Sequence, residues 1–410
     1  MRIIKLVWYF WFWAYVRIAL SIYFRRIKIS GKENIPKGVP VIFGANHENA
    51  LIDPLIMTTR FPLMIHYLVR ADVFKNPIIR KFLNSLNLMP VYRIRDGVNS
   101  VKANEEIFKN CFRAFSKKEH LILFPEASHD EKRQKKIAKK GIARIALGAM
   151  HEPDAPEELF IVPVGMNYSR HQTFRSTVHI AFGEPIKIQK VEQTNENIEN
   201  LRIEYNEAVA KCYVSFPRDK FDVLDKIFFH DLPSDLPIKV NEVNELGYRV
   251  AEKLSSADEK EILESASALE KEGLKFPFER KKNFVINFIK SILLAPLGLV
   301  GMIIHAPGLL LGAYIMKGIK DKVYKDTIFF GVGMVLMPVS WGLLGWWIST
   351  LEYNMLLKTG LIAFMPITLL AFSSMIQDWR FFSSNMRLVR NPVLKEKYEE
   401  FVKKVALVKA

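Results

Sequence analysis

The sequence predicts an α/β domain with a mostly parallel central sheet flanked by helices, between an N-terminal interfacial helix and a C-terminal α-helical membrane domain. Two observations predict this arrangement. Short apolar runs alternate with helical patterns from residue 26 to residue 190, which is typical of α/β domains. Three long runs without Lys, Arg, Asp or Glu follow residue 290, and each is about long enough to cross a bilayer.

The first 25 residues are hydrophobic and dense in aromatic side chains. Seven of the eight residues from Trp8 to Tyr15 are aromatic. The longest uncharged run, Leu6–Val16, is short for a membrane span, and basic residues follow where a signal peptide would have a small-residue cleavage site. We therefore predict that residues 1–25 form a helix in the membrane interface, with its aromatic face toward lipid. A tilted membrane-spanning helix is the alternative.

Residues 26–215 are assigned to the α/β domain. Its strand candidates are Ile27–Ser30, Val39–Phe43, His66–Val69, Leu88–Tyr92, Leu121–Phe124, Phe160–Val164 and Val178–Phe182. Its helix candidates are 54–60, 77–86, 98–117, 139–150 and 197–214. The next segment, 216–282, is charged and lacks long apolar runs, so we expect an insert of solvated helices there.

The composition narrows the choice of partners. The chain has 410 residues and a formal net charge of +16, and half of its residues are hydrophobic. Such a basic chain can bind nucleic acid or an anionic membrane. All seven tryptophans lie within or beside long hydrophobic segments, which is typical of a membrane interface. We therefore expect a phospholipid membrane as partner and no nucleic acid. Cys111 and Cys212 form neither a disulfide framework nor a metal-ligand spacing, so we expect no metal site.

Residues 41–54, VIFGANHENALIDP, are the first candidate site. The apolar run predicts a strand, and Asp-Pro predicts a helix with Asp53 as N-cap and Pro54 at its first position. His47 then lies between a strand and a helix, where open α/β sheets place reactive groups. If Asp53 held one ring nitrogen of His47, the other nitrogen could take a proton from a hydroxyl. A loop histidine beside a helix-capping aspartate would give the same pattern.

Two further strand ends carry charged side chains. Arg93 and Arg95 follow the strand at 88–92, where planar guanidinium groups can bind phosphate or can remain solvated. Phe124, Pro125 and Glu126 follow the strand at 121–124, where a carboxylate can hold a hydroxyl-bearing substrate or a cation.

The fourth stretch, FIVPVGMN at 160–167, contains Pro163 inside a strand pattern. Proline there predicts an edge strand or a bulge, often beside a site. Before it, the basic run at 132–146 predicts a loop and a helix that can bind phosphate or lie solvated.

In chain order the four stretches read strand–NHxxxxxD, strand–PVxR, strand–FPEAS and strand–VPV. This order resembles the glycerolipid acyltransferase superfamily, which includes the glycerol-3-phosphate and lysophosphatidate acyltransferases. The resemblance covers about residues 26–190. It implies that His47 is the general base and Asp53 its orienter. It also implies substrate-binding roles for Asn46, Arg93, Arg95, Phe124, Pro125, Glu126, Ser128 and Pro163.

The resemblance implies transfer of a fatty acyl group from acyl-CoA or acyl carrier protein to a glycerophosphate acceptor, without a cofactor. Five residues separate His47 from Asp53, and this spacing resembles the branch that acylates glycerol-3-phosphate or dihydroxyacetone phosphate. Asn87, Pro90 and Ala127 depart from the family pattern. A lyso-lipid acceptor, an inactive lipid-binding protein and a hydrolase are the alternatives; the common serine hydrolase would need a GxSxG motif, which the chain lacks. The sequence does not distinguish the acceptors or donors, nor the oligomeric state.

The membrane domain is predicted over residues 283–385, followed by a basic tail at 386–410. Its uncharged runs are Ser291–Met316, Thr327–Ser349 and Gly360–Gln377. Basic residues flank the first run on both sides, which the positive-inside rule assigns to the cytoplasmic face. We therefore expect Pro296 and Pro307 to divide it into a re-entrant or interfacial pair of short helices. The other two runs would cross, leaving the catalytic domain and the C-terminus on the cytoplasmic face. Three ordinary spans are the alternative.

Overall fold

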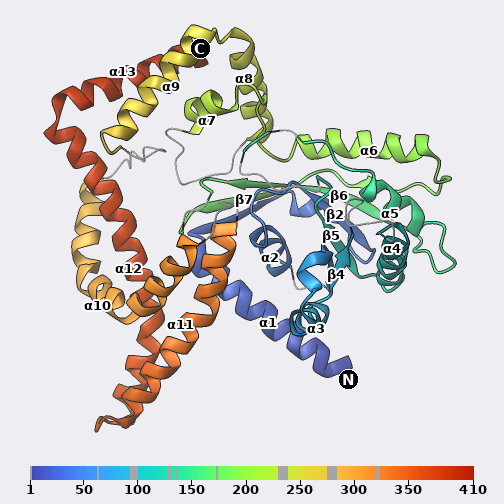
Figure 1. Ribbon diagram of the computed structural model, residues 1–410, viewed down its shortest axis with the longest axis horizontal. Coiled ribbons are helices and arrows are strands. Elements are labelled where there is room, and N and C mark those ends of the chain that lie inside the picture. The colour runs from blue at the N-terminus through green and yellow to red at the C-terminus, as the bar shows by residue number, and fades with distance from the viewer. Residues whose placement is uncertain are drawn as a thin grey trace. The chain divides into compact units, whose positions relative to one another are not determined.

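Figure 1 shows the protein as a computed structural model. The structure describes residues 2–61, 64–92, 100–126, 132–134, 136–171, 174–229, 239–274, 284–318 and 324–410. These residues group into two compact units. The first unit takes 2–171, 177–215 and 239–242, and the second takes 174–176, 216–229 and 243–410, within the described ranges.

The first unit is built on an eight-stranded sheet with the order β1-β7-β6-β2-β5-β3-β4, in which β8 also pairs with β6. All neighbours are parallel except β6 with β7 and β6 with β8, so the predicted mostly parallel sheet is confirmed. The strands are β1 (Arg26–Ser30), β2 (Val41–Ala45), β3 (Ile65–Arg70), β4 (Leu88–Val91), β5 (His120–Leu123), β6 (Phe160–Tyr168), β7 (Thr177–Phe182) and β8 (Ile186–Lys187).

Helices cover the sheet, as the alternating pattern predicts (Figure 1). They are α1 (Arg2–Tyr23), α2 (Ile52–Thr59), α3 (Pro77–Ser85), α4 (Ser100–Ser116), α5 (Gly141–Ala149) and α6 (Asn195–Ala210), with short 3-10 helices at Lys32–Asn34 and Ala71–Phe74. One core joins α4, α5 and α6 to the sheet, where Phe115, Ile142 and Tyr205 pack against Leu121 and Ile161. This core holds the strand ends that carry the candidate site.

Two local expectations are wrong. Asp53 is not the N-cap of α2, because the helix begins at Ile52 after Leu51, and the Asp53 carboxylate instead accepts backbone N–H groups of the preceding turn. Pro163 does not lie on an edge strand, because β6 pairs with β2 through it, although the register on the other side of β6 shifts by one residue between Ile161↔Ile186 and Val164↔Phe182. On the other side of β6 the partner changes from β8 to β7 at this residue, and the Pro163 carbonyl accepts from Gly183 N at 2.8 Å. The missing N–H of proline therefore falls where no ladder bond is needed.

The chain after Ser215 is mainly helical where the structure describes it. Its helices are α7 (Phe221–Phe229), α8 (Val240–Lys253), α9 (Ser256–Lys271), α10 (Phe284–Lys317), α11 (Tyr324–Thr350), α12 (Met355–Arg390) and α13 (Pro392–Lys409). Four helical segments of the described chain are long and apolar enough to cross a membrane: Ile3–Tyr23, Phe288–Lys317, Thr327–Thr350 and Met355–Ile376. The predicted C-terminal region of long apolar helices is therefore present.

Helix α10 does not divide into two short helices, so that expectation is wrong: the helix continues through Pro296 and Pro307. Its neighbours nevertheless show that it turns back. In the first part of α10, Gly298 lies against Met375 of α12 and Gly301 against Thr368 of α12. In the second part, Gly308 lies near Met337 of α11 and Gly312 near Val332 of α11. Helices α11 and α12 are antiparallel neighbours joined between Thr350 and Met355. The contacts of α10 therefore run first toward this connection, along α12, and then away from it, along α11. Figure 1 shows the corresponding bend in α10 beside α11 and α12.

The bend in α10 carries a buried polar group. His305 is fully buried, and its Nδ1 accepts from Trp341 Nε1 of α11 at 3.3 Å. Its Nε2 then carries the proton and lies 3.3 Å from Thr368 Oγ1 of α12. One histidine therefore ties the bend to both neighbouring helices.

Candidate active site

The candidate base lies directly after β2. The strand is buried over Val41–Ala45, and close packing there requires Gly44, since a Cβ atom would come within 2.6 Å of the Tyr205 ring. Two residues beyond the strand, the chain turns toward α2 and places His47 at the carboxyl end of the sheet. The His47 side chain is 17% exposed, so a substrate can reach it.

His47 and Asp53 are brought together as the sequence predicts. His47 Nδ1 lies 2.8 Å from Asp53 Oδ2, and the Asp53 side chain is fully buried. The same oxygen accepts from the backbone N–H groups of Glu48 and Asn49 at 2.9 and 2.8 Å. A buried carboxylate needs several donors, and here they also fix it against one ring nitrogen. The pair therefore has the geometry of a general base and its orienter.

Tyr168, at the end of β6, is a site residue that the sequence reasoning missed. Its fully buried hydroxyl donates to Asp53 Oδ1, the carboxylate oxygen on the side away from His47. The Tyr168 carbonyl in turn accepts from Arg133 Nη2 at 2.9 Å, and the Arg133 side chain is buried. The predicted strand ended at Val164, and the period-2 alternation Val164, Met166, Tyr168 would have extended it to this residue.

Glu126 and Phe124 also meet His47. The Phe124 ring stacks on the imidazole with 4.1 Å between ring centroids and 20° between planes. Glu126 Oε2 accepts the His47 backbone N–H at 3.4 Å and lies 3.3 Å from Lys136 Nζ. Burial raises the pKa of the Glu126 carboxyl to about 7, against the opposing effect of the Lys136 ammonium. Lys136 comes from the predicted basic loop, and its Nζ lies 3.5 Å from the His47 carbonyl.

The residues around His47 tie the turn to the sheet. Asn46 accepts from Met166 N at 2.6 Å and donates to the Met166 carbonyl and to Glu48. Glu48, also buried, pairs with His171 through a 2.7 Å contact. The Asn46 amide therefore joins β2 to β6, a function that the motif alone does not indicate.

The other expected site residues divide into two groups. The Pro125 carbonyl accepts from Lys139 N at 2.8 Å, which holds the turn that follows β5, and Pro163 lies opposite Gly44 in the sheet. Arg93, Arg95 and Ser128 lie outside the described residues. Among the residues described, no group of three His, Cys, Asp or Glu side chains is placed to hold a metal ion.

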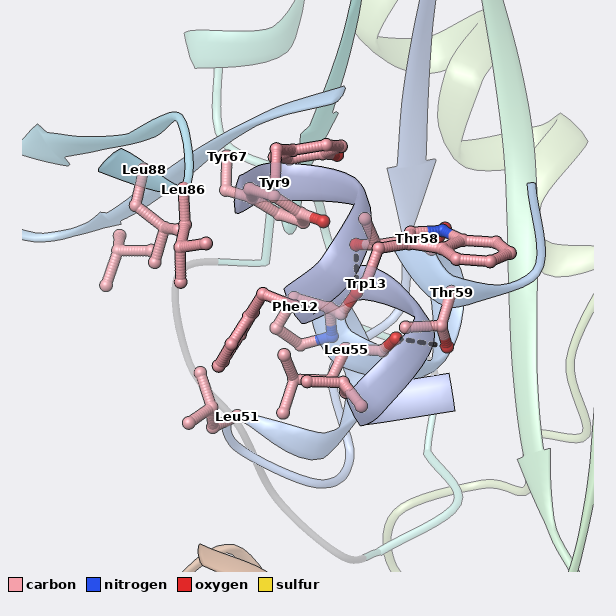
Figure 2. A pocket seen from close by; sticks show the side chains of 13 residues that line it. Tyr9, Phe12, Trp13, Leu51, Leu55, Thr58, Thr59, Tyr67, Leu86 and Leu88 are labelled. Atoms are coloured by element: carbon pink, nitrogen blue, oxygen red, sulfur yellow. Dashed lines mark hydrogen bonds between the residues drawn. The ribbon is translucent and has the colours of Figure 1, made fainter. Parts of the chain in front are cut away.

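An apolar pocket begins at the same turn (Figure 2). It is lined by α1, α2, β3 and β4 through Tyr9, Phe12, Trp13, Val16, Leu51, Pro54, Leu55, Thr58, Thr59, Tyr67, Val69, Leu86 and Leu88. The hydroxyls of Thr58 and Thr59 donate to carbonyls of their own helix, at 2.6 Å to Pro54 and 2.8 Å to Leu55. The lining is therefore apolar in effect, and it suits a hydrocarbon chain.

Comparison with known proteins agrees with this geometry. The family model described as Acyltransferase matches residues 26–167. Glycerol-3-phosphate O-acyltransferase 2 of Saccharomyces cerevisiae is 26% identical over 166 residues, which are 37% of this chain and 22% of the yeast protein. The 1-acyl-sn-glycerol-3-phosphate acyltransferase of Bacillus subtilis is 24% identical over 140 residues, which are 33% of this chain and 67% of that protein.

Among solved structures, the 1-acyl-sn-glycerophosphate (LPA) acyltransferase of Thermotoga maritima is similar, with a TM-score of 0.34 and 19% identity over 46% of this chain and 71% of that one. The matched part of this chain spans about a fifth of the length of the yeast protein. The matched residues 26–167 contain both His47 and Asp53, joined as the motif requires. Residues 26–167, which contain the candidate site, are therefore similar to the Acyltransferase family.

Proposed function

We propose that the protein transfers a fatty acyl group from an acyl thioester to the hydroxyl of a glycerophosphate acceptor, with glycerol-3-phosphate favoured. The observation that carries this proposal is the His47–Asp53 pair, in which a fully buried carboxylate holds Nδ1 of a reachable imidazole. With Nδ1–H donating to Asp53, the other nitrogen, Nε2, is the basic one.

In the proposed reaction, the acceptor hydroxyl gives its proton to His47 Nε2 while its oxygen attacks the thioester carbonyl. Asp53 stabilises the imidazolium that forms. Collapse of the tetrahedral intermediate breaks the C–S bond, and the thiolate takes the proton from His47. A general base of this kind contributes about 10²–10⁴-fold in rate.

Two features support the substrate classes. The apolar pocket begins at Leu51 and Pro54, on the turn that carries the base, and its lining suits part of the fatty acyl chain of the donor, since the cavity volume is about 60 Å³. Lys136 lies beside the base and supplies a positive charge for the acceptor phosphate, together with Arg93 or Arg95 of the matched family segment. The N–H groups of Glu48 and Asn49 already donate to Asp53, so we do not assign them to the oxyanion.

The acceptor is the part of this proposal that needs the sharpest test. Glycerol-3-phosphate is favoured by the five-residue spacing and by the yeast relative, and 1-acyl-glycerol-3-phosphate by the Bacillus relative. Purified protein in detergent is given acyl-CoA or acyl carrier protein with each acceptor in turn, and thiol release and lipid product are measured. Thiol release that requires an acceptor supports acyl transfer, and thiol release without an acceptor indicates hydrolysis. No thiol release with any combination of donor and acceptor contradicts an enzymatic function.

Comparing Arg93→Ala with Arg95→Ala identifies the phosphate ligand. Loss of the bidentate partner is expected to raise KM for the acceptor more than KM for the donor. An effect confined to Arg95→Ala would move the role by two residues.

We also propose that the catalytic domain and the C-terminus lie on the cytoplasmic face. The bend of α10 at His305 supports the return of this helix to the side from which it enters, which leaves α11 and α12 as the crossing pair. On a cysteine-free background, an impermeant thiol reagent added outside is expected to label Asn354→Cys and not Lys395→Cys. External labelling of position 395 would contradict this topology.

A further inference from the structure

Helix α3 presents an apolar face that the proposed reaction does not use. Ile78 is 79% exposed, and Ile79 and Phe82 are also exposed. Helical spacing places these three side chains on one side of α3, while Arg80, Lys81 and Asn84 lie on the other. A monomeric protein rarely leaves such a contiguous apolar face in water, so the face indicates a partner.

The apolar face of α3 continues a larger surface on α1. Trp8 Nε1 donates to Ser85 Oγ at 3.1 Å, and the Phe12 ring meets the Phe82 ring edge to face at 5.6 Å. On α1 the exposed apolar side chains include Val7, Trp11 and Ile18, which helical spacing also places on one side. We call these exposed residues of the two helices, Val7, Trp11, Ile18, Ile78, Ile79 and Phe82, the α1–α3 surface.

Helix α1 is held against the domain by its opposite side. Trp13 Nε1 donates to the Thr58 and Phe61 carbonyls at 2.9 and 3.1 Å, and Arg17 donates to the Thr59 carbonyl at 2.8 Å. These bonds come from two side chains one turn apart and join the middle of the helix to α2 and the turn that follows. A partner that covers the outer side of α1 therefore also lies next to α3, because Trp8 and Phe12 of α1 contact Ser85 and Phe82 of α3.

We propose that α3 is a second membrane-contacting element, and that the α1–α3 surface is the side on which the catalytic domain rests in the bilayer interface. The occupant is a phospholipid bilayer with anionic headgroups. Three observations favour lipid: α1 is long and apolar enough for a membrane, Trp8 and Trp11 stack along it, and the exposed Lys75 lies two residues before α3. Tryptophan and basic side chains are the residues that meet headgroups.

The proposal does not depend on acyl transfer. It assigns a lipid contact to a helix whose average hydrophobicity would not mark it as a membrane segment. It also places Phe12, which lines the apolar pocket, next to the membrane-facing residues of α3.

The test uses the full-length protein, because its C-terminal apolar helices keep it in the membrane whether or not α3 touches lipid. Single-cysteine variants Ile78→Cys and Ile79→Cys are labelled with an environment-sensitive fluorophore, with Lys81→Cys and Asn84→Cys as controls on the opposite side of α3. Cys111 and Cys212, both buried, are replaced beforehand. Each protein is reconstituted into phosphatidylcholine–phosphatidylglycerol vesicles.

Probes at 78 and 79 are expected to show blue-shifted emission, quenching by lipids with a nitroxide on the acyl chain, and protection from aqueous iodide. The probes at 81 and 84 are expected to show the reverse. Equal iodide quenching on both sides would overturn the proposal. Protection at 78 and 79 without quenching by the lipid nitroxide would also overturn it, because a protein would then cover the face.

Discussion

Replacing Asp53 with asparagine tests whether its carboxylate orients the base or only supports the fold. The carboxylate accepts four hydrogen bonds, from His47 Nδ1, from the N–H groups of Glu48 and Asn49, and from the Tyr168 hydroxyl. An asparagine side chain keeps one oxygen in the place of Oδ2, so three of these bonds persist without the negative charge. Its amide nitrogen faces the tyrosine oxygen, which must then accept.

The expected size of both effects follows from this geometry. A hydrogen bond to a charged group contributes about 1.5–3 kcal/mol and a neutral one about 0.5–1.5 kcal/mol, so about 1 kcal/mol is lost at each of three bonds and Asp53→Asn should destabilise the fold by about 3 kcal/mol. Because the imidazolium loses its counter-charge, turnover should fall by at least about 10²-fold, which corresponds to about 2.7 kcal/mol of activation free energy.

Tyr168→Phe is the matched control. It removes one hydrogen bond from the same carboxylate, on the side away from His47, and Tyr168 is fully buried, so water does not replace the hydroxyl. We expect a destabilisation of about 1.5–3 kcal/mol, close to that of Asp53→Asn. Turnover should fall much less, because the bond between His47 and Asp53 remains.

The assay measures kcat from thiol release and stability from unfolding of the same detergent preparations. The expected result is a similar loss of stability in the two variants with a large difference in kcat. If Tyr168→Phe lowers kcat as much as Asp53→Asn, the carboxylate acts through the fold and not on the imidazole. Loss of the residue that orients the base should lower kcat by at least about 10²-fold. If Asp53→Asn keeps more than about a tenth of the wild-type kcat, the assignment of His47 as the base is itself wrong.

Three further predictions concern the surroundings of the base. Burial raises the pKa of Glu126 from 4.5 to about 7, so between these pH values the folded protein holds a proton that the unfolded chain releases. The free energy of unfolding should therefore fall by up to about 3 kcal/mol as pH rises from about 4.5 to 7. Equal slopes of unfolding free energy against pH for wild type and Glu126→Gln would refute this. Lys136→Met should raise KM for the acceptor more than for the acyl donor, whereas Lys139→Met serves as a nearby control; equal effects of the two on steady-state kinetics would remove Lys136 from the site. Gly165→Ala should destabilise the fold by about 1–3 kcal/mol or more in thermal unfolding, because its Cβ would meet the Cys212 carbonyl oxygen at 1.8 Å. Gly141→Ala, which has open space at its Cβ, should be neutral or stabilising in the same measurement.

The sequence by itself determined the elements of the α/β domain and the principal pair of its site. Each predicted strand and helix of residues 26–215 is present within a few residues, because buried parallel strands and amphipathic helices leave strong apolar patterns. His47 and Asp53 meet because only five residues separate them and a helix begins within that interval. Local spacing alone was sufficient for this contact.

Contacts between distant segments were decided only by the tertiary structure. Tyr168 reaches Asp53 across 115 residues of chain, Lys136 reaches the His47 carbonyl across 89, and Glu126 accepts its backbone N–H across 79. These residues meet because β2 lies between β5 and β6 in the sheet. Strand order depends on the packing of the whole domain, and no periodicity in the sequence encodes it.

The same distinction explains the two errors at the site. Asp53 has the residue type and the position of an N-cap, yet its carboxylate is held by His47, two backbone N–H groups of the turn and a tyrosine from β6. Pro163 has the residue type of an edge strand, yet it lies in the interior of the sheet, at one of the two positions of β6 between the end of one partner strand and the start of the next. In both cases the local propensity of the residue favoured the predicted role. The contacts that the folded sheet supplies are more numerous, and they determine the role observed in the structure.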